Sequence, residues 1–263
     1  MAEIPACNIC GSSHNATIIA NVQNKGTNLV ECECGLRFFS PRPSLAELKV
    51  EWASPAFQEV LHKESISLYE TGLFFGADPA QDYTTKIEDI KSYYRATYNK
   101  IIKIWKTQPS SILEVGCSIG RFLSICREEM AYGSRIRGID INPFAAQIAR
   151  EKLAIDVVYD DFAEHPYIET FDWVIMLDYI EHSYRPREDI EKARILLNHG
   201  GLLILKTFLE DLDPDHVMML PPCHAYHFYG DVLYRLLRKN GFRILSWETE
   251  FNNHQVLLIA KKT

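Results

Sequence analysis

Residues Ile112 to Phe122 read ILEVGCSIGRF and give the strongest indication of the fold class. The stretch opens with an apolar run typical of a buried strand, and small residues follow directly. Gly116 and Gly120, with Ser118 between them, let the backbone turn sharply and approach a ligand. The helix that follows would direct its N-terminal N–H groups toward the same place. The pattern therefore predicts a strand, a ligand-binding turn and a helix.

A carboxylate ends the next predicted strand. That strand covers residues 135–140 and ends at Asp140, 24 residues after Gly116. At this spacing in a parallel sheet, a carboxylate is placed to accept hydrogen bonds from both hydroxyls of a ribose. A structural alternative makes Asp140 the N-cap of the following helix. A dinucleotide dehydrogenase shares the ribose-binding logic, but its Gly-x-Gly-x-x-Gly spacing is absent here.

Strands and helices alternate from residue 110 to the end of the chain. The predicted strands are 112–115, 135–140, 156–159, 171–177, 201–207, 242–249 and 255–260. The predicted helices are 121–130, 143–153, 186–198 and 230–240. Alternation indicates a parallel sheet, whereas the short link at 250–254 makes the last two strands antiparallel. The predicted fold class is α/β, with a doubly wound, seven-stranded, mostly parallel sheet of Rossmann-like type.

Four of the seven cysteines lie near the N-terminus, in two close pairs. Cys7 pairs with Cys10, Cys32 pairs with Cys34, and a glycine follows each pair. Such pairs at the two ends of a hairpin-sized spacer suit a tetrahedral, structural zinc site. The alternative is four unrelated buried thiols. Because the second pair is Cys-x-Cys, His14 is the natural substitute for one ligand.

The chain is predicted to have three parts. Short strands at 17–20 and 28–31 make residues 1–43 a zinc ribbon. Apolar residues at three- and four-residue spacing make 44–107 a helical connector or lid. The alternating sheet occupies 108–263.

Charge and hydropathy argue against a nucleic-acid partner and against a membrane span. The 263 residues include 28 Lys and Arg against 35 Asp and Glu, a formal net charge of -7. This balance argues against a protein that binds nucleic acid through a broad basic face. No apolar run reaches the roughly 18 to 20 residues that cross a bilayer, and the first residues do not resemble a secretion signal. We therefore expect a cytoplasmic protein without a membrane span.

At the glycine-rich turn and Asp140 the sequence resembles the class I S-adenosylmethionine-dependent methyltransferases, along residues 110–263. The family turn, Glu-x-Gly-x-Gly-x-Gly, corresponds to 114–120, with Ser118 in place of the middle glycine. The resemblance implies S-adenosylmethionine as cofactor. The binding residues that it implies are Glu114, Gly116, Ser118, Gly120, Asp140, Ile141, Asp161, Phe162 and Leu177. Asp161 would bind the adenine amino group; as an alternative it is a plain loop carboxylate.

Two histidine-containing segments are candidates for the chemistry. Asp178, Glu181 and His182 follow the fourth strand with a spacing similar to that of the cation-binding residues in the ubiquinone-biosynthesis O-methyltransferases. Three readings stay open for this segment: a divalent cation site, His182 as general base, or a structural turn. His227 matches a histidine common in the family and is the second candidate base. His224 lies three residues before it, and the two could also share a metal.

The resulting prediction is methyl transfer from S-adenosylmethionine to a small polar acceptor, such as a sugar, a nucleotide-linked sugar or a natural-product intermediate. A zinc ribbon joined to this domain resembles the nucleotide-sugar C-methyltransferases. One alternative is an rRNA or tRNA methyltransferase with a zinc module, although the ribbon carries only three basic side chains against three acidic ones. Another is a non-catalytic zinc-ribbon scaffold that keeps the fold. The oligomeric state is not indicated by the sequence.

Overall fold

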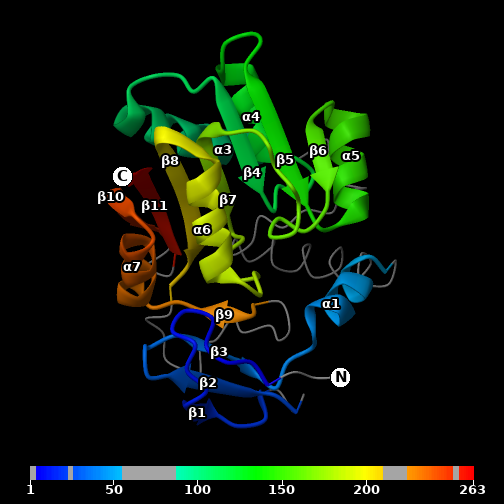
Figure 1. The fold of residues 1–263 in the computed structure, drawn as a ribbon. Helices are drawn as coiled ribbons and strands as arrows, with labels where there is room; N and C mark the ends of the chain where they lie inside the picture. Colours follow the sequence, from blue (N-terminus) through cyan, green and yellow to red (C-terminus); the bar gives the residue numbers. More distant parts are fainter. Residues whose placement is uncertain (1–3, 23–25, 55–86, 210–223, 251–254) are drawn as a thin grey trace. The chain divides into compact units, whose positions relative to one another are not determined.

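A computed structural model describes residues 4–22, 26–54, 87–209, 224–250 and 255–263 (Figure 1). Residues 55–86 of the predicted helical connector lie outside the described residues. Of the connector, the structure describes helix α1 (Leu45–Trp52) and helix α3 (Ile87–Trp105). Both are helical as the three- and four-residue spacing predicts.

The main sheet has seven strands in the order β10-β11-β8-β7-β4-β5-β6. Their bounds are β4 Ser111–Val115, β5 Arg135–Asp140, β6 Asp156–Tyr159, β7 Phe171–Leu177, β8 Leu197–Phe208, β10 Phe242–Glu250 and β11 Gln255–Lys262. The pairs β4–β5, β5–β6 and β7–β8 are parallel, whereas β11 is antiparallel to both β8 and β10. The predicted α/β fold with a mostly parallel sheet is confirmed.

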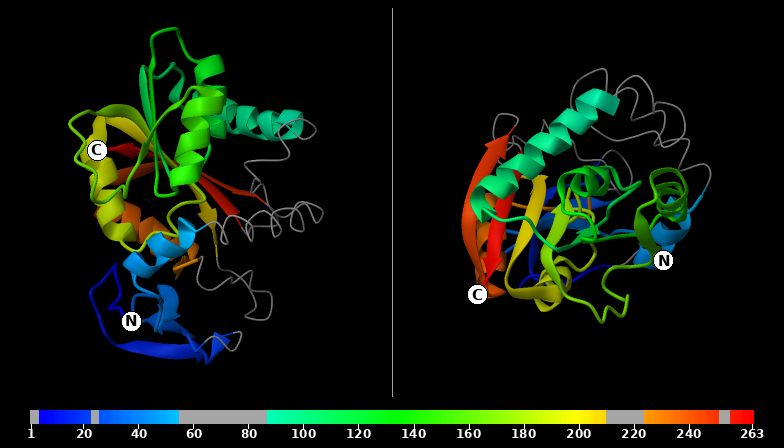
Figure 2. Two further views of the ribbon diagram at one scale, coloured as in Figure 1. Left: turned by 90° about the vertical axis from the view of Figure 1, so that its right-hand side faces the viewer. Right: turned by 90° about the horizontal axis from the view of Figure 1, so that it is seen from above.

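Four helices connect the strands close to where the sequence predicts them. They are α4 Arg121–Glu129, α5 Pro143–Leu153, α6 Pro186–Leu196 and α7 Gly230–Lys239. Proline opens α5 and α6, where its missing N–H is not needed by the helix. In Figures 1 and 2, α5 runs beside β6 and α7 beside β10, and these pairs are in contact.

The N-terminal ribbon has more strands than predicted. Strands β1 (Asn15–Ile19), β2 (Asn28–Cys32) and β3 (Arg37–Ser40) form an antiparallel sheet that β9 (Tyr226–His227) completes at the edge of β3. The predicted segments at 17–20 and 28–31 correspond to β1 and β2. The other two strands were not predicted, because β9 has only two residues and depends on β3 for its backbone partners.

The chain divides into two compact units. One contains residues 1–45 and 166–263, and the other contains 46–165. The first unit therefore holds the ribbon together with β7, β8, β9, β10 and β11, and the second holds β4, β5 and β6 with their helices. The three-part division of the sequence stays a prediction. Among the described residues, no helix is both long and apolar enough to cross a membrane.

Candidate functional site

The turn after β4 adopts the left-handed backbone that its small residues permit. Gly116, Ser118 and Gly120 have φ of 67°, 49° and 79°. Ser118 thus takes the conformation that a glycine would take in the family turn, although a serine pays a small steric penalty there. Gly120 lies at the N-terminus of α4, where an added Cβ would come within 3.5 Å of Ile155. The turn has the sharp reversal that the sequence predicts.

Asp140 is held at the end of β5 by backbone N–H groups. The amide of Ser118 donates to Oδ2 at 2.7 Å, and the amide of Asn142 donates to Oδ1 at 2.7 Å. Burial raises the pKa of Asp140, against these two hydrogen bonds, which favour the charged form. Asn142 caps α5 by accepting from the amides of Phe144 and Ala145. The helix cap is therefore Asn142, and the N-cap alternative for Asp140 is wrong.

Glu114 is a buried carboxylate whose hydrogen-bonding capacity is not filled by the described residues. It lies in β4 and is 4% exposed, and its Oε2 has no hydrogen-bond partner among the described residues. Burial, and next the charge of Asp140, raise the pKa of Glu114 well above its ordinary value. A buried acceptor of this kind calls for a donor. The ammonium group of an amino-acid moiety has the matching charge and hydrogen-bonding capacity.

The loop after β6 contains the predicted adenine-binding residues. Asp161 accepts from the amide of Ala163 at 3.0 Å, and its Oδ2 lies 2.9 Å from Nζ of Lys49 in α1. Phe162 is buried. The neighbouring Asp160 has a lowered pKa because its carboxylate is hydrogen-bonded to His165. The sequence pattern gave no reason to select Lys49, since α1 lies far from this loop in the chain.

Two further predicted cofactor residues lie at strand ends. Ile141 directly follows β5 and Leu177 is the last residue of β7, and both are half-buried. Their role at the cofactor stays a prediction.

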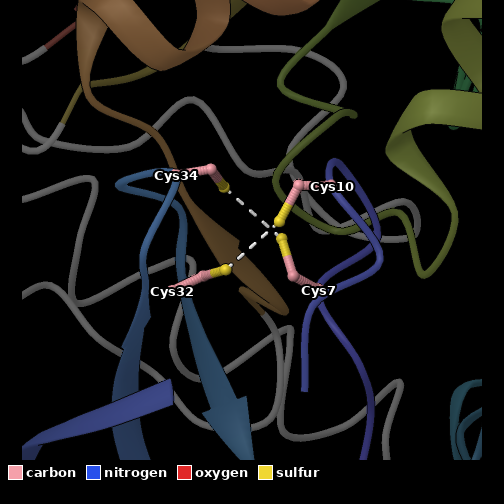
Figure 3. A group of neighbouring side chains, drawn as sticks. All are labelled: Cys7, Cys10, Cys32 and Cys34. Atoms are coloured by element: carbon pink, nitrogen blue, oxygen red, sulfur yellow. Dashed lines mark hydrogen bonds between the residues drawn. The ribbon is translucent and has the colours of Figure 1, made fainter. Parts of the chain in front are cut away.

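The four cysteines of the ribbon converge as predicted. Figure 3 shows their sulfur atoms pointing toward one another, with Sγ of Cys7 3.5 Å from Sγ of Cys34 and Sγ of Cys10 3.3 Å from Sγ of Cys32. All four ligand atoms lie within 4.8 Å of one another. His14 is exposed and does not belong to this group.

Two glycines shape the turns that carry these cysteines. Gly11 and Gly35 have φ of 77° and 84°, as expected for residues that directly follow the cysteine pairs. The amide of Gly11 donates to the carbonyl of Cys7 at 2.8 Å, and that of Gly35 to the carbonyl of Cys32 at 2.7 Å. Each cysteine pair is therefore held on a closed backbone turn.

A second cluster forms from the turn after β7 and the residue two before β9. One ligand atom each from Glu181, His182 and His224 lies within 4.8 Å of the others. The rings of His182 and His224 meet edge to face at 4.7 Å. Burial, and next the nearby His182 and His227, lower the pKa of His224 well below its ordinary value. The sequence pairs His224 with His227 and does not indicate a relation to Glu181.

Glu181 and Asp178 have different surroundings. Glu181 is 2% exposed, accepts from the hydroxyl of Thr207 at 2.8 Å through Oε2, and has no described hydrogen-bond partner at Oε1. Burial, and next the charge of Asp178, raise the pKa of Glu181. Asp178 is half exposed at its carboxylate and lies 3.3 Å from Nζ of the buried Lys206. Among the described residues, Asp178 does not join the cluster, so the predicted set of Asp178, Glu181 and His182 is corrected to Glu181, His182 and His224.

His227 lies in β9, opposite Arg37 of β3, and is buried. Its ring packs edge to face on Phe39 at 5.3 Å, and its distance to the ring of His224 is 6.2 Å. His227, the second candidate base, therefore belongs to a strand of the ribbon sheet. The sequence does not predict this position.

Comparisons with known proteins show the family of the chain and its fold. Residues 87–247, more than half of the chain, match a family described as a methyltransferase domain. The chain belongs to this family. A mitochondrial ubiquinone biosynthesis O-methyltransferase of Schizosaccharomyces pombe is 27% identical over 134 residues, which are 44% of this chain and 47% of that protein. The chain spans between 18% and 65% of the length of the curated relatives that it matches.

Solved methyltransferases share the fold. Magnesium protoporphyrin IX methyltransferase from Synechocystis PCC 6803, with bound SAH, superposes with a TM-score of 0.55 at 17% identity over 78% of this chain and 98% of that one. The 1,6-didemethyltoxoflavin-N1-methyltransferase of Burkholderia thailandensis, with bound S-adenosylhomocysteine, gives 0.53 at 16% identity over 95% and 99%. At these identities the likeness concerns the fold.

Proposed function

We propose that the protein transfers a methyl group from S-adenosylmethionine to a small polar acceptor, such as a sugar, a nucleotide-linked sugar or a natural-product intermediate. The observation that carries this proposal is the pair of carboxylates at the ends of adjacent parallel strands in a methyltransferase domain. Glu114 lies in β4 with a buried oxygen that has no hydrogen-bond partner in the part of the chain that the structure describes, and Asp140 ends β5. Ligands of open α/β sheets bind at these carboxyl ends.

The residues of the turn suit the groups of this cofactor. Glu114, which is buried, would accept from the ammonium of the methionine portion. Asp140 would accept from the ribose hydroxyls, because the amides of Ser118 and Asn142 hold its two oxygens before the ligand arrives. Gly116, Ser118 and Gly120 keep side-chain bulk away from the path of the cofactor. When bound, S-adenosylmethionine supplies an activated methyl group, and the electron pair of the broken carbon–sulfur bond stays on sulfur.

The chain's own contribution to the chemistry would be position and proton removal. An acceptor hydroxyl or carbon acid must lose a proton as it attacks the methyl carbon, and His182 and His227 are the candidate bases. His182 is half-buried in the turn after β7, which suits a group that must reach an acceptor and exchange its proton. The buried His227 on β9 has less access. We therefore propose His182, before His227, as the general base.

We propose a structural zinc ion for the four cysteines. Zinc–sulfur bonds of about 2.3 Å in a tetrahedron place the sulfur atoms about 3.7 Å apart, close to the two separations of 3.5 and 3.3 Å. Four thiolates with no water position suit a structural ion. This ion would stabilise the ribbon and, through the β3–β9 pairing, the strand that carries His227.

An RNA methyltransferase with a zinc module and a scaffold without turnover are the competing functions. The net charge of -7 disfavours the first, because RNA binding depends on cationic contacts with phosphates. The second differs from an enzyme only in lacking transfer, so activity must separate them.

The test is calorimetric titration with S-adenosylhomocysteine, followed by transfer of a labelled methyl group to sugars, phenols and RNA. We expect cofactor binding and labelling of a small polar acceptor. Binding without transfer to any acceptor would favour the scaffold, labelled RNA would favour the nucleic-acid enzyme, and failure to bind would reject the cofactor.

A further inference from the structure

We propose that Glu181, His182 and His224 form a second metal site, which binds a divalent transition-metal cation and presents it to an acceptor with two adjacent oxygen atoms. The cation site stands on its own geometry. Its role toward the acceptor rests on the proposed function. With the cation bound, His182 is a ligand and no longer the general base, and the cation itself lowers the pKa of the acceptor hydroxyl.

The donor atoms match such a cation. One carboxylate oxygen and two imidazole nitrogens within 4.8 Å of one another form a mixed oxygen and nitrogen set. Zinc, manganese, iron and cobalt accept this set, whereas magnesium and calcium prefer oxygen alone. Ligands that share an ion through bonds of about 2.1 Å lie about 3 to 3.5 Å apart, so small side-chain rotations complete the site.

Glu181 gives independent support for a ligand at this place. Its side chain is 2% exposed, Thr207 occupies Oε2, and Oε1 has no hydrogen-bond partner among the described residues. A buried carboxylate oxygen without a partner is costly. A cation bound by Oε1 of Glu181 and by the two imidazoles would compensate for this cost, because it accepts a lone pair of Oε1.

The two segments that supply the ligands are held together by the backbone. The amide of Tyr226 donates to the carbonyl of Glu181 at 3.1 Å, which fixes the residues before β9 against the turn after β7. On the other side of Tyr226, His227 is paired with Arg37 of the ribbon. The ligands are therefore preorganised by the fold, as a specific metal site requires.

Three protein ligands leave at least one coordination position open. A hydroxyl with a neighbouring hydroxyl or carbonyl would fill the open positions as a chelate, and coordination lowers the pKa of a bound hydroxyl. A vicinal diol or an α-hydroxy ketone has this chemistry. A cation at this site would therefore favour small polar acceptors that carry two adjacent oxygen atoms.

The experiment measures metal per chain after loading the full protein with cobalt and removing excess ion. We expect about two equivalents in the wild type, about one in His224→Gln and Glu181→Gln, and about two in Asp178→Asn and in His199→Gln, which changes an exposed histidine outside the cluster. Equal loss in Asp178→Asn and His224→Gln would overturn the ligand set. About one equivalent in the wild type would overturn the site.

A spectroscopic titration keeps the inference testable if a variant fails to fold. Wild-type protein with zinc bound at the cysteines should gain a visible cobalt absorption without the strong sulfur-to-cobalt band, because its ligands contain no thiolate. No such absorption up to millimolar cobalt would reject the site. If cobalt binds and a vicinal diol leaves its absorption unchanged, the acceptor role fails. Binding of S-adenosylhomocysteine tests the proposed function separately, since Glu114 and Asp140 do not belong to the cluster.

Discussion

Asp140 and Glu181 both follow or end a parallel strand, but they are held in different ways. Backbone amides of Ser118 and Asn142 hold the two oxygens of Asp140. Glu181 is held by the side chain of Thr207 and faces two imidazoles from separate segments. The first arrangement is produced by turns that directly follow two strands. The second exists only when distant segments pack together.

Loss of a zinc ligand in the ribbon, which belongs to the same unit as Glu181, should destabilise the protein most. Cys10 is exposed, so as a plain thiol its replacement by serine would change the free energy of unfolding by less than about 0.5 kcal/mol. As a zinc ligand it should cost more than about 3 kcal/mol, because structural zinc supplies folding energy. Denaturant unfolding and zinc content measure both effects, with His14→Gln as the control. Zinc lost in His14→Gln and kept in Cys10→Ser would contradict the four-cysteine site.

The same variant distinguishes the two regions. In Cys10→Ser we expect faster hydrogen exchange at the amides of Arg37 and His227, which are paired between β3 and β9, since the amide of Tyr226 donates to Glu181. The amides of Ser118 and Asn142 should stay protected, because their acceptor Asp140 lies in the other unit. Equal loss of protection in both regions would mean that they unfold together.

The second prediction concerns Asp140. Asp140→Ala should weaken binding of S-adenosylhomocysteine about 100-fold, since two charge-assisted hydrogen bonds to the ribose disappear and the amides of Ser118 and Asn142 lose their acceptor. Metal content should not change. Asp156→Ala, at an exposed position of the neighbouring strand β6, is the matched control for calorimetry. An affinity within threefold of the wild type would remove Asp140 from the cofactor site.

The same contrast explains what could be predicted from the sequence. The strand, turn and acidic strand end around Gly116 and Asp140 are local patterns, and so are the two cysteine pairs with their glycines. His224 could not be assigned to Glu181, because no spacing rule relates a loop residue to a turn that precedes it by a helix and a strand. The edge strand β9 was missed for a related reason: two residues have no periodicity, and their strand conformation comes from pairing with β3.

A third prediction tests how the ribbon is joined to the segments around Glu181. Arg42 is 5% exposed, and its guanidinium lies 4.1 Å from the ring centroid of Tyr184 and 4.9 Å from that of Tyr226. It also donates to the hydroxyl of Tyr226 at 3.2 Å. Arg42→Met keeps much of the side-chain volume but loses the charge and the hydrogen bond, so we expect a loss of about 2 kcal/mol in unfolding free energy.

The control for Arg42 is Arg243→Met, at an exposed position of β10, which should change stability by less than about 0.5 kcal/mol. We also expect Arg42→Met to lower the cobalt content of the second cluster while the affinity for S-adenosylhomocysteine stays within twofold. If Arg42→Met instead lowered the affinity for S-adenosylhomocysteine and kept the cobalt content, Arg42 would support the cofactor site and not the region around Glu181.

A weaker effect is expected at Lys49, whose Nζ is 2.9 Å from Oδ2 of Asp161. If Asp161 binds the adenine amino group, Lys49 competes for the same oxygen, and Lys49→Ala should tighten binding of S-adenosylhomocysteine. The side chain of Lys49 is 38% exposed, so the ion pair is worth no more than about 1 kcal/mol, which limits the gain to about fivefold. Asp161→Ala should weaken the same binding, and Lys103→Ala, at an exposed position of α3, should leave it unchanged. If the affinity is unchanged in both Lys49→Ala and Asp161→Ala, Asp161 is a loop carboxylate without a role at the cofactor. Lys49 and the amide of Ala163 would then stabilise its charge, in the same way that two backbone amides stabilise the charge of Asp140.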